Sequence, residues 1–354
     1  MRVALIDPSL FTWPYDSALA LALRAEGHDV TIVGKPLAKA GAGPAHDLLW
    51  PYFYRRLRPN PTRGLSKALF LARKGVSHAL SMRTLARELG PWRPDVIHFQ
   101  WAPLPMVDRL FLAAVRELAP IVFTVHDSTP FNGNPRSFIQ AAGALGILSR
   151  FDRLIVHTQQ AVSRLRTYGV PDELVRCVPH GPLDATTSER ASAQARAIDP
   201  QPDARASGAP VQVLLFGKIK PYKGADVLVR AAALMDPAIR KRCRIRIVGE
   251  PYIDLAPLEL AIREANMADQ VRIEPRFVAE QDVDALLASA DILVFPYRQI
   301  DASGVLMKSL ALGVPIVATG IGLFAEMLVD GRHGRLVAAD DPASLARALE
   351  QLVC

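Results

Sequence analysis

Short apolar runs alternate with amphipathic helical patterns along most of this chain, and this alternation restricts the possible folds more than any other feature. Within the runs, apolar residues occupy consecutive positions instead of every second one. Strands of that kind are buried on both faces, as in parallel sheets with helices on either side. We therefore expect a doubly wound α/β fold. The expected strands span residues 3–7, 30–33, 96–99, 121–125, 154–156, 211–216, 244–248, 271–274, 292–295 and 316–318. The expected helices include residues 17–26, 108–118, 158–168, 225–233, 257–265, 283–289 and 305–312.

One stretch interrupts the alternation. Residues 184–210 are rich in alanine, serine, proline and charge and have almost no large apolar side chains, which is typical of a linker or loop. They divide the chain into an N-terminal domain, residues 1–183, and a C-terminal domain, residues 211–354. At 354 residues the chain is long enough for two such cores. Two doubly wound, Rossmann-like domains facing a central cleft would bind ligands at the carboxyl ends of both sheets.

Several common kinds of site are missing from the sequence. Neither the G-x-G-x-x-G fingerprint nor a P-loop follows an expected strand, and no His/Cys pattern is typical of a metal site. The three cysteines, Cys177, Cys243 and Cys354, are too scattered for a disulfide framework. No apolar stretch is long enough for a transmembrane helix. We therefore expect a cytoplasmic protein.

The positive charge is concentrated in residues 50–93. The net charge of the chain is +7, but residues 48–93 hold ten basic residues and one acid, Glu88, so the remainder is slightly acidic. The segment begins with aromatic residues and continues as an amphipathic helical pattern, which suits an anionic membrane surface. The alternative is a helix packed on the core with a solvated basic face, and both interpretations remain open. We do not expect nucleic acid as a partner, because no binding motif accompanies the charge.

The clearest candidate site opens the C-terminal domain. Strand 211–216 ends in Gly217 and Lys218, and Lys223 and Gly224 follow before the next helix. Glycine lets the backbone approach a ligand, and two lysines at the carboxyl end of a buried strand would neutralise a diphosphate. The alternative is an exposed basic turn. In the same domain, Ser303 stands at the start of a helix, where free backbone N–H groups favour an anion, although an ordinary serine cap would have the same sequence.

Together these motifs resemble those of the family-four retaining glycosyltransferases, which have the GT-B fold. The resemblance covers most of residues 211–337, in the family's order, and is looser in the N-terminal half. The matching sequences of the C-terminal half are Gly217-Lys218 with Lys223-Gly224, Val248-Gly249-Glu250-Pro251, Asp291-Ile292-Leu293-Val294-Phe295-Pro296, Ser303-Gly304 with Gly313-Val314-Pro315, and Gly322 with Glu326. Those of the N-terminal half are Gly27-His28-Asp29-Val30, residues 95–101, Thr124-Val125-His126-Asp127 and Val178-Pro179-His180-Gly181.

The resemblance implies transfer of a sugar from a nucleotide diphosphate sugar to an acceptor hydroxyl, with retention of configuration, in bacterial polysaccharide or glycolipid assembly. It implies a sugar or lipid-linked acceptor and neither a metal nor another cofactor. Fixed cations would lower the barrier, because charge grows on the departing diphosphate in the transition state. The implied catalytic residues are His126, Lys218 and Lys223. The implied donor-binding residues are Gly217, Gly249, Glu250, Ser303, Gly304, Val305 and Glu326, and the implied acceptor-binding residues are Phe11, Trp13 and Asp127.

The sequence departs from the family pattern at the position that holds ribose. The family commonly has two glutamates separated by seven residues, and the second grips the ribose hydroxyls. One alignment register puts Asp301 and Ser309 at these positions, and the other puts Ile300 and Lys308 there. A non-catalytic sugar-nucleotide-binding or partner subunit with a degenerate donor site is therefore the alternative function.

Two further departures concern single side chains. Lys218 stands where the family usually has arginine, so the charge is kept but the bidentate fork is lost. In place of a glycine pair, the loop after the first strand carries Phe11, Trp13 and Tyr15. These rings either stack on an acceptor or hold the loop on the core, and the sequence leaves both open.

Overall fold

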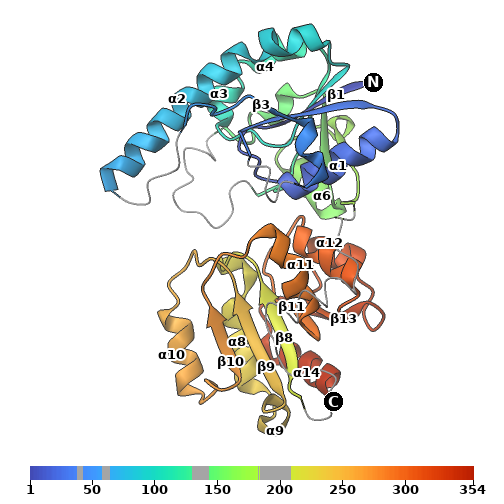
Figure 1. Cartoon of the computed structure of the whole chain (residues 1–354). Helices are drawn as coiled ribbons and strands as arrows, with labels where there is room; N and C mark the ends of the chain where they lie inside the picture. Colours follow the sequence, from blue (N-terminus) through green and yellow to red (C-terminus); the bar gives the residue numbers. More distant parts are fainter. Residues whose placement is uncertain (38–42, 58–63, 130–142, 182, 184–208) are drawn as a thin grey trace. The chain divides into compact units, whose positions relative to one another are not determined.

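The computed structural model describes residues 1–37, 43–57, 64–129, 143–181, 183 and 209–354 (Figure 1). The chain divides into two compact units, Met1–Pro179 (unit 1) and His180–Cys354 (unit 2). The predicted linker lies almost entirely outside the described residues, so the predicted domain limits stay a prediction.

Unit 1 is built on a seven-stranded parallel sheet in the order β3-β2-β1-β4-β5-β6-β7. The chain starts in the middle of the sheet, winds to one edge and returns to wind to the other, as in a doubly wound fold. The strands are β1 (Arg2–Asp7), β2 (Asp29–Gly34), β3 (Leu49–Pro51), β4 (Val96–Phe99), β5 (Ile121–Thr124), β6 (Arg153–Val156) and β7 (Val175–Cys177). The helices are α1 (Trp13–Ala25), α2 (Gly64–Leu89), α3 (Pro105–Asp108), α4 (Leu112–Arg116) and α6 (Gln159–Thr167).

Both faces of the unit 1 sheet are buried. Successive residues of a strand point to opposite faces, and in β1 Ala4 and Ile6 join one apolar cluster while Val3 and Leu5 join another. The first cluster includes Met82 of α2, and the second includes residues of α1. Burial of both faces explains why apolar residues occupy consecutive positions in these strands.

Unit 2 has a six-stranded parallel sheet in the order β10-β9-β8-β11-β12-β13. Residues of α8, α10 and α14 pack with β8 and β9 in one apolar cluster, while α11 and α12 lie side by side (Figure 1). The strands are β8 (Val211–Phe216), β9 (Cys243–Val248), β10 (Val271–Glu274), β11 (Ile292–Phe295), β12 (Ile316–Thr319) and β13 (Gly334–Val337). The helices are α8 (Ala225–Leu234), α9 (Pro237–Arg240), α10 (Ala256–Glu264), α11 (Glu280–Ala288), α12 (Gly304–Leu312), α13 (Gly322–Met327) and α14 (Pro342–Val353).

The predicted α/β architecture is confirmed, with differences at the sheet edges and in one helix. All ten predicted strands are present, and the edge strands β3, β7 and β13 are additional. The predicted helix 108–118 is wrong, because α3 and α4 are separate short helices. Asp108 is the last residue of α3, and its carboxylate bonds to His78 and accepts a hydrogen bond from the backbone N–H of Leu104. Within the described ranges, no helix combines the length and apolarity needed to cross a bilayer.

Candidate functional site

Residues 217–224 form a compact turn at the carboxyl end of β8, in the middle of the unit 2 sheet. The backbone N–H of Gly217 donates to the carbonyl oxygen of Val248, 3.0 Å away. A β-carbon on Gly217 would lie 2.4 Å from Nζ of Lys223 and would displace the lysine ammonium, and the φ of +122° at this position also favours glycine. Gly249 is more strictly constrained, because its β-carbon would lie 2.0 Å from the backbone carbonyl oxygen of Gly217. The glycines of the motif therefore bring the ends of β8 and β9 together around Lys223.

Lys223 is a buried cation. Only 9% of the residue is exposed, and its Nζ lies 4.9 Å from the ring centroid of Tyr297, at a distance typical of a cation–π contact. Burial lowers the pKa of Lys223. Among the described residues no carboxylate lies within ion-pair distance of it. A buried ammonium without a carboxylate is costly, and an anionic ligand would offset that cost.

Arg298 fixes the turn that carries Lys223, a role that the sequence did not indicate. Its guanidinium donates to the carbonyl oxygen of Pro221 at 2.7 Å and pairs with Asp226 and Asp340, each at 2.7 Å. Its backbone N–H donates to the carbonyl oxygen of Tyr222. Because β8 and β11 are neighbouring parallel strands, Arg298, which follows β11, reaches the turn that follows β8.

Lys218 and Glu250 lie at the same edge but differ from Lys223 in exposure. Both are exposed, and Tyr252 connects them: its hydroxyl donates to Glu250 Oε2 at 3.3 Å, and Lys218 Nζ lies 5.5 Å from its ring centroid. The predicted pair of lysines therefore consists of one buried and one exposed cation, and the catalytic role of Lys218 stays a prediction.

Ser303 caps α12, which agrees with the interpretation of Ser303 as an ordinary serine cap. Its Oγ accepts from the backbone N–H of Leu306 at 3.2 Å. The N–H groups of Gly304 and Val305 belong to the first helical turn, which has no intrahelical acceptors for them. These groups stand at the carboxyl edge beside the Lys223 turn, since α12 follows β11. Glu326 is exposed on the short helix α13.

The positions predicted for a ribose-binding acid hold other groups. Lys308 is buried and pairs with Asp284 at 2.8 Å and Glu280 at 3.3 Å, both on α11. Burial opposes its charge, but these carboxylates raise the pKa of Lys308. The Ser309 hydroxyl donates to the carbonyl oxygen of Val305 at 2.7 Å. The ammonium of Lys308 thus joins α12 to α11.

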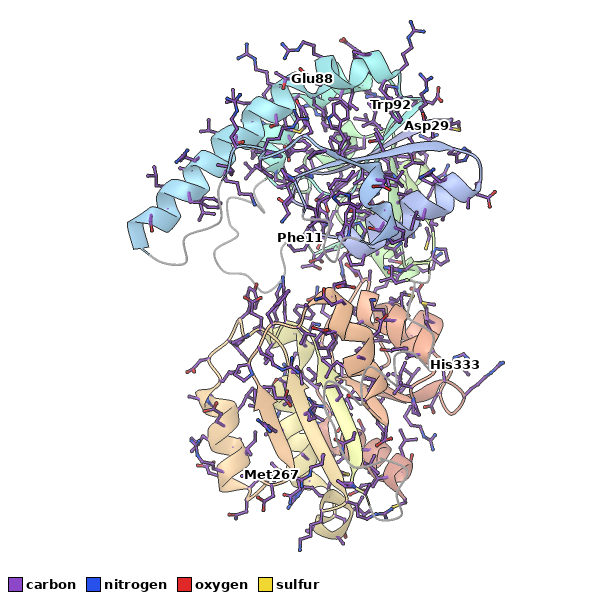
Figure 2. The ribbon with its side chains drawn as sticks, in the orientation of Figure 1. Phe11, Asp29, Glu88, Trp92, Met267 and His333 are labelled. Carbon is purple, nitrogen blue, oxygen red and sulfur yellow. The ribbon has the colours of Figure 1, made fainter. Side chains whose placement is uncertain are left out.

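In unit 1, five rings form an aromatic cluster at the carboxyl edge of the sheet. The ring of His126 is stacked with Trp101 at a centroid distance of 5.6 Å and meets Tyr15 edge-on at 4.8 Å. Phe11 lies 4.8 Å from Trp101, and His157 lies 5.5 Å from His126. Phe11 is 64% exposed, and Figure 2 labels it on the loop after β1. Trp101 ends the family-like segment 95–101 but was not assigned to the site, and His157 was not predicted, because it follows β6 singly, without a motif.

The other predicted residues of unit 1 divide between this cluster and the core. Nε2 of His126 bonds to Gln100 Oε1 at 3.0 Å, and Asp127 accepts from the backbone N–H of Thr129 in a turn. Trp13 is half-buried against the core, so it holds the loop in place. His98 is buried against Thr124, and burial lowers the pKa of His98 to about 4, which keeps the ring neutral.

A pair of buried carboxyl groups lies below this loop. Asp7 ends β1, and its carboxylate accepts from the backbone N–H groups of Ser9 and Thr12 at 3.1 and 3.0 Å. Asp16 of α1 is fully buried beside it. Burial, and then the negative charge of Asp7, raise the pKa of Asp16 well above its ordinary value. Within the described ranges, no group of three or more His, Cys, Asp or Glu side chains is arranged to hold a metal ion.

Family models and curated relatives match both units. The model described as glycosyl transferases group 1 matches residues 210–354, and the model described as glycosyltransferase family 4 matches residues 17–182. A D-inositol 3-phosphate glycosyltransferase of Streptomyces scabiei is 32% identical, over 95% of this chain and 76% of the relative. D-inositol 3-phosphate glycosyltransferase 2 of Catenulispora acidiphila is 30% identical, over 88% of this chain and 74% of the relative.

Solved structures confirm the predicted GT-B fold. HepE of Anabaena, in complex with UDP and glucose, has a TM-score of 0.70 and 16% identity, with 100% of this chain and 90% of HepE covered. WaaG, a glycosyltransferase involved in lipopolysaccharide biosynthesis, has a TM-score of 0.63 and 17% identity, with 99% and 90% covered.

Proposed function

Because the chain belongs to glycosyltransferase family 4, we propose that it transfers a hexose from a nucleotide diphosphate sugar to an acceptor hydroxyl with retention of configuration. The buried ammonium of Lys223 carries this proposal. It lies at the carboxyl end of the central strand β8, where nucleotide ligands of such sheets bind, and has no carboxylate partner among the described residues. A diphosphate gains negative charge as it leaves, so a fixed cation there stabilises the transition state more than the ground state.

The other donor-side roles follow from the same edge of unit 2. Lys218 would add a second, exposed cation, and the first N–H groups of α12, at Gly304 and Val305, would donate to phosphate oxygens. Gly249 and Glu250 would line the nucleoside side. The proposal needs no metal, because the cations and backbone donors supply the positive charge at the diphosphate.

We assign the acceptor to unit 1, at the aromatic cluster. Exposed Phe11 and the stacked pair Trp101 and His126 offer ring faces of the kind on which sugars pack. The relatives named D-inositol 3-phosphate glycosyltransferases and the lipopolysaccharide enzyme WaaG support a sugar-like acceptor in polysaccharide or glycolipid assembly. A test of transfer should therefore include D-inositol 3-phosphate and lipid-linked sugars among the acceptors.

The direct test is a panel of UDP-, GDP- and ADP-sugars incubated with the purified chain, with hydrolysis of the donor as readout. We expect slow hydrolysis of one donor without any acceptor. Lys223→Ala should lower that rate by about 100-fold or more, since removing one fixed transition-state donor costs that much in other enzymes. Lys241→Ala, which removes an exposed lysine next to α9, is the matched control and should keep the wild-type rate. Equal rates in Lys223→Ala and Lys241→Ala would overturn the assignment.

A non-catalytic partner subunit is the second candidate function. Lys308 favours it, because a lysine paired with α11 stands where a ribose-binding carboxylate was expected. This candidate predicts that a nucleotide sugar raises the melting temperature but is never hydrolysed or transferred. Any turnover above the rate of Lys223→Ala excludes it.

We also propose that the chain works at the cytoplasmic face of a membrane, through helix α2. Leu69, Val76 and Leu80 are more than half exposed, and their spacing of seven and four residues puts them on one helix face. Arg73 and Arg83 are exposed beside them. The N-terminal half of α2 reaches beyond the rest of unit 1 (Figure 1). An apolar stripe flanked by arginines suits an anionic lipid surface.

A further inference from the structure

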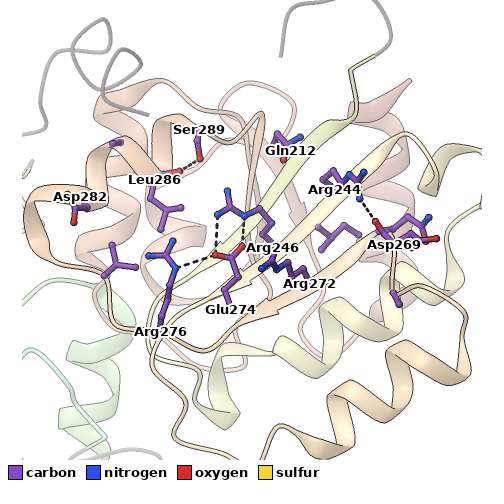
Figure 3. Close-up of a pocket in the computed structure, with 15 residues that line it drawn as sticks. Gln212, Arg244, Arg246, Asp269, Arg272, Glu274, Arg276, Asp282, Leu286 and Ser289 are labelled. Carbon is purple, nitrogen blue, oxygen red and sulfur yellow. Dashed lines mark hydrogen bonds and ion pairs between the residues drawn. The ribbon is translucent and has the colours of Figure 1, made fainter. Parts of the chain in front are cut away.

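One part of the unit 2 sheet carries arginines where the rest of the sheet carries apolar residues. In β9, Cys243, Ile245 and Ile247 belong to the apolar core, so the alternate residues Arg244 and Arg246 point to the opposite face. The chain passes from β10, at the edge of the sheet, to β11, which lies beyond β9 and β8. Helix α11 lies on this crossover, and its residues Asp282, Ala285 and Leu286 line one side of the space over the outer part of that face. A cavity of about 610 Å³ lies between α11 and the outer strands (Figure 3).

Like charges are placed side by side on the floor of this cavity. Arg246 of β9 and Arg272 of β10 are register partners on neighbouring parallel strands, so their side chains leave the same face. Such a pair is destabilising unless something neutralises it. Glu274 neutralises part of this positive charge. It accepts two hydrogen bonds from Arg246, at 2.7 and 3.2 Å, and pairs with Arg276 at 3.3 Å.

Two arginines of the lining are not neutralised by an acidic side chain of the described residues. Arg244 donates to the backbone carbonyl of Asp269, and Arg272 is exposed. Neither has a carboxylate within ion-pair distance among the described residues. The remaining acids of the lining, Asp269 and Asp282, lie at opposite ends of it (Figure 3). The middle of the cavity is therefore positive, and Glu274 holds Arg246 in a fixed orientation there.

We propose that this cavity binds a small molecule that carries phosphate groups, held by Arg244 and Arg272 beside the fixed Arg246. Guanidinium forks match phosphate oxygens in bidentate geometry, and the volume is in the range of small-molecule sites. Arg244 lies away from the donor site. Arg244 is the second residue of β9, near its amino end, whereas the Lys223 turn lies at the carboxyl end of β8. The inference does not depend on the proposed function.

Calorimetric titration with pyrophosphate tests the proposal, because pyrophosphate offers the shared chemistry without a base or sugar. The wild-type chain should bind two pyrophosphates, one at Lys223 and one at the arginines, and Lys223→Ala should retain one. In the Lys223→Ala background, adding Arg244→Gln and Arg272→Gln should weaken the remaining binding at least tenfold. Adding Arg263→Gln, an exposed arginine of α10, is the matched control and should not change it.

Two results would overturn the proposal: unchanged binding after Arg244→Gln and Arg272→Gln, or no pyrophosphate binding in Lys223→Ala. A second measurement needs no variant. Phenylglyoxal modification, mapped by mass spectrometry on the wild-type chain, should slow several-fold at Arg244 and Arg272 when pyrophosphate is present, and stay unchanged at Arg263. Protection by polyglutamate without protection by pyrophosphate would instead identify a surface for an acidic protein, and the small-molecule site would be wrong.

Discussion

At the scale of single residues, the carboxyl pair Asp7 and Asp16 links the folding of unit 1 to pH. Burial raises the pKa of Asp16 in the folded chain, so the folded state keeps a proton that the unfolded state has already lost. The folded state then binds more protons over the pH range above the ordinary carboxyl pKa, and its stability falls as pH rises through that range. The pair supports the loop that carries Phe11, through the hydrogen bonds of Asp7 to Ser9 and Thr12.

Asp16→Asn removes this titration while keeping a neutral side chain of the same shape. We expect the stability of the wild type to fall relative to Asp16→Asn as pH rises above the ordinary carboxyl pKa, with a slope of at most about 1.4 kcal/mol per pH unit. Urea unfolding followed by tryptophan fluorescence measures it, because all four tryptophans lie in unit 1. Asp47→Asn, at a carboxylate whose side chain is 88% exposed, is the control. A stability difference between wild type and Asp16→Asn that is constant with pH would contradict the prediction.

The same scale shows which residues of a site can be found without a structure. Lys223 and Gly217 were predicted because they follow a recognisable strand within one short segment. Arg298 was not, because its partners Pro221, Asp226 and Asp340 are 42 to 77 positions away in the sequence. Asp16 was placed in the loop before the expected helix 17–26, since nothing local indicates that its side chain meets Asp7.

At the scale of elements, apolar periodicity found the central strands and the edge strand β10, but it missed the edge strands β3, β7 and β13. The runs of β1, β8 and β11 are apolar because helices cover both faces of those strands. An edge strand such as β3 (Leu49–Pro51) has one neighbour and three residues, and its Trp-Pro sequence shows no strand period. In α2 the periodicity was right about the helix but could not separate the exposed Leu69 and Val76 from the buried Met82. The exposed stripe was visible only once the packing was known.

The exposed stripe of α2 gives a prediction about membranes. Vesicles with anionic lipid should float the chain at low salt, and neutral vesicles should not. Arg73→Gln with Arg83→Gln should reduce binding at least about tenfold, since each basic residue near an anionic surface contributes about 1 kcal/mol. Leu69→Gln with Val76→Gln should reduce it further. Arg24→Gln, an exposed arginine at the end of α1, serves as control. Flotation that ignores salt and all four substitutions would mean that α2 does not carry the binding and is only a solvated helix.

At the scale of the whole molecule, the chain consists of two folding units with separate apolar cores. The core of unit 2 is formed by β8, β9 and the helices α8, α10 and α14, all from residues after 209. Every proposed donor-binding residue, from Gly217 to Glu326, belongs to the same unit. The composition of residues 184–210 predicted a division of the chain, and the limits of that division stay a prediction. The arginine-lined cavity of unit 2 was not predicted, because alternate arginines in a strand resemble ordinary solvated positions.

A fragment of residues 209–354 should therefore fold alone and bind the nucleoside diphosphate of whichever donor the panel identifies. We expect its affinity, by calorimetry, to lie within about threefold of that of the full chain, because its Lys223 turn is fixed by Arg298 and Asp226 from the same unit. The fragment should lack transfer activity, since the proposed acceptor residues lie in unit 1. Lys223→Ala in the fragment should lose nucleotide binding, and Lys241→Ala should keep it. A cooperatively folded fragment that binds the nucleotide more than tenfold more weakly than the full chain would show that unit 1 contributes to the donor site.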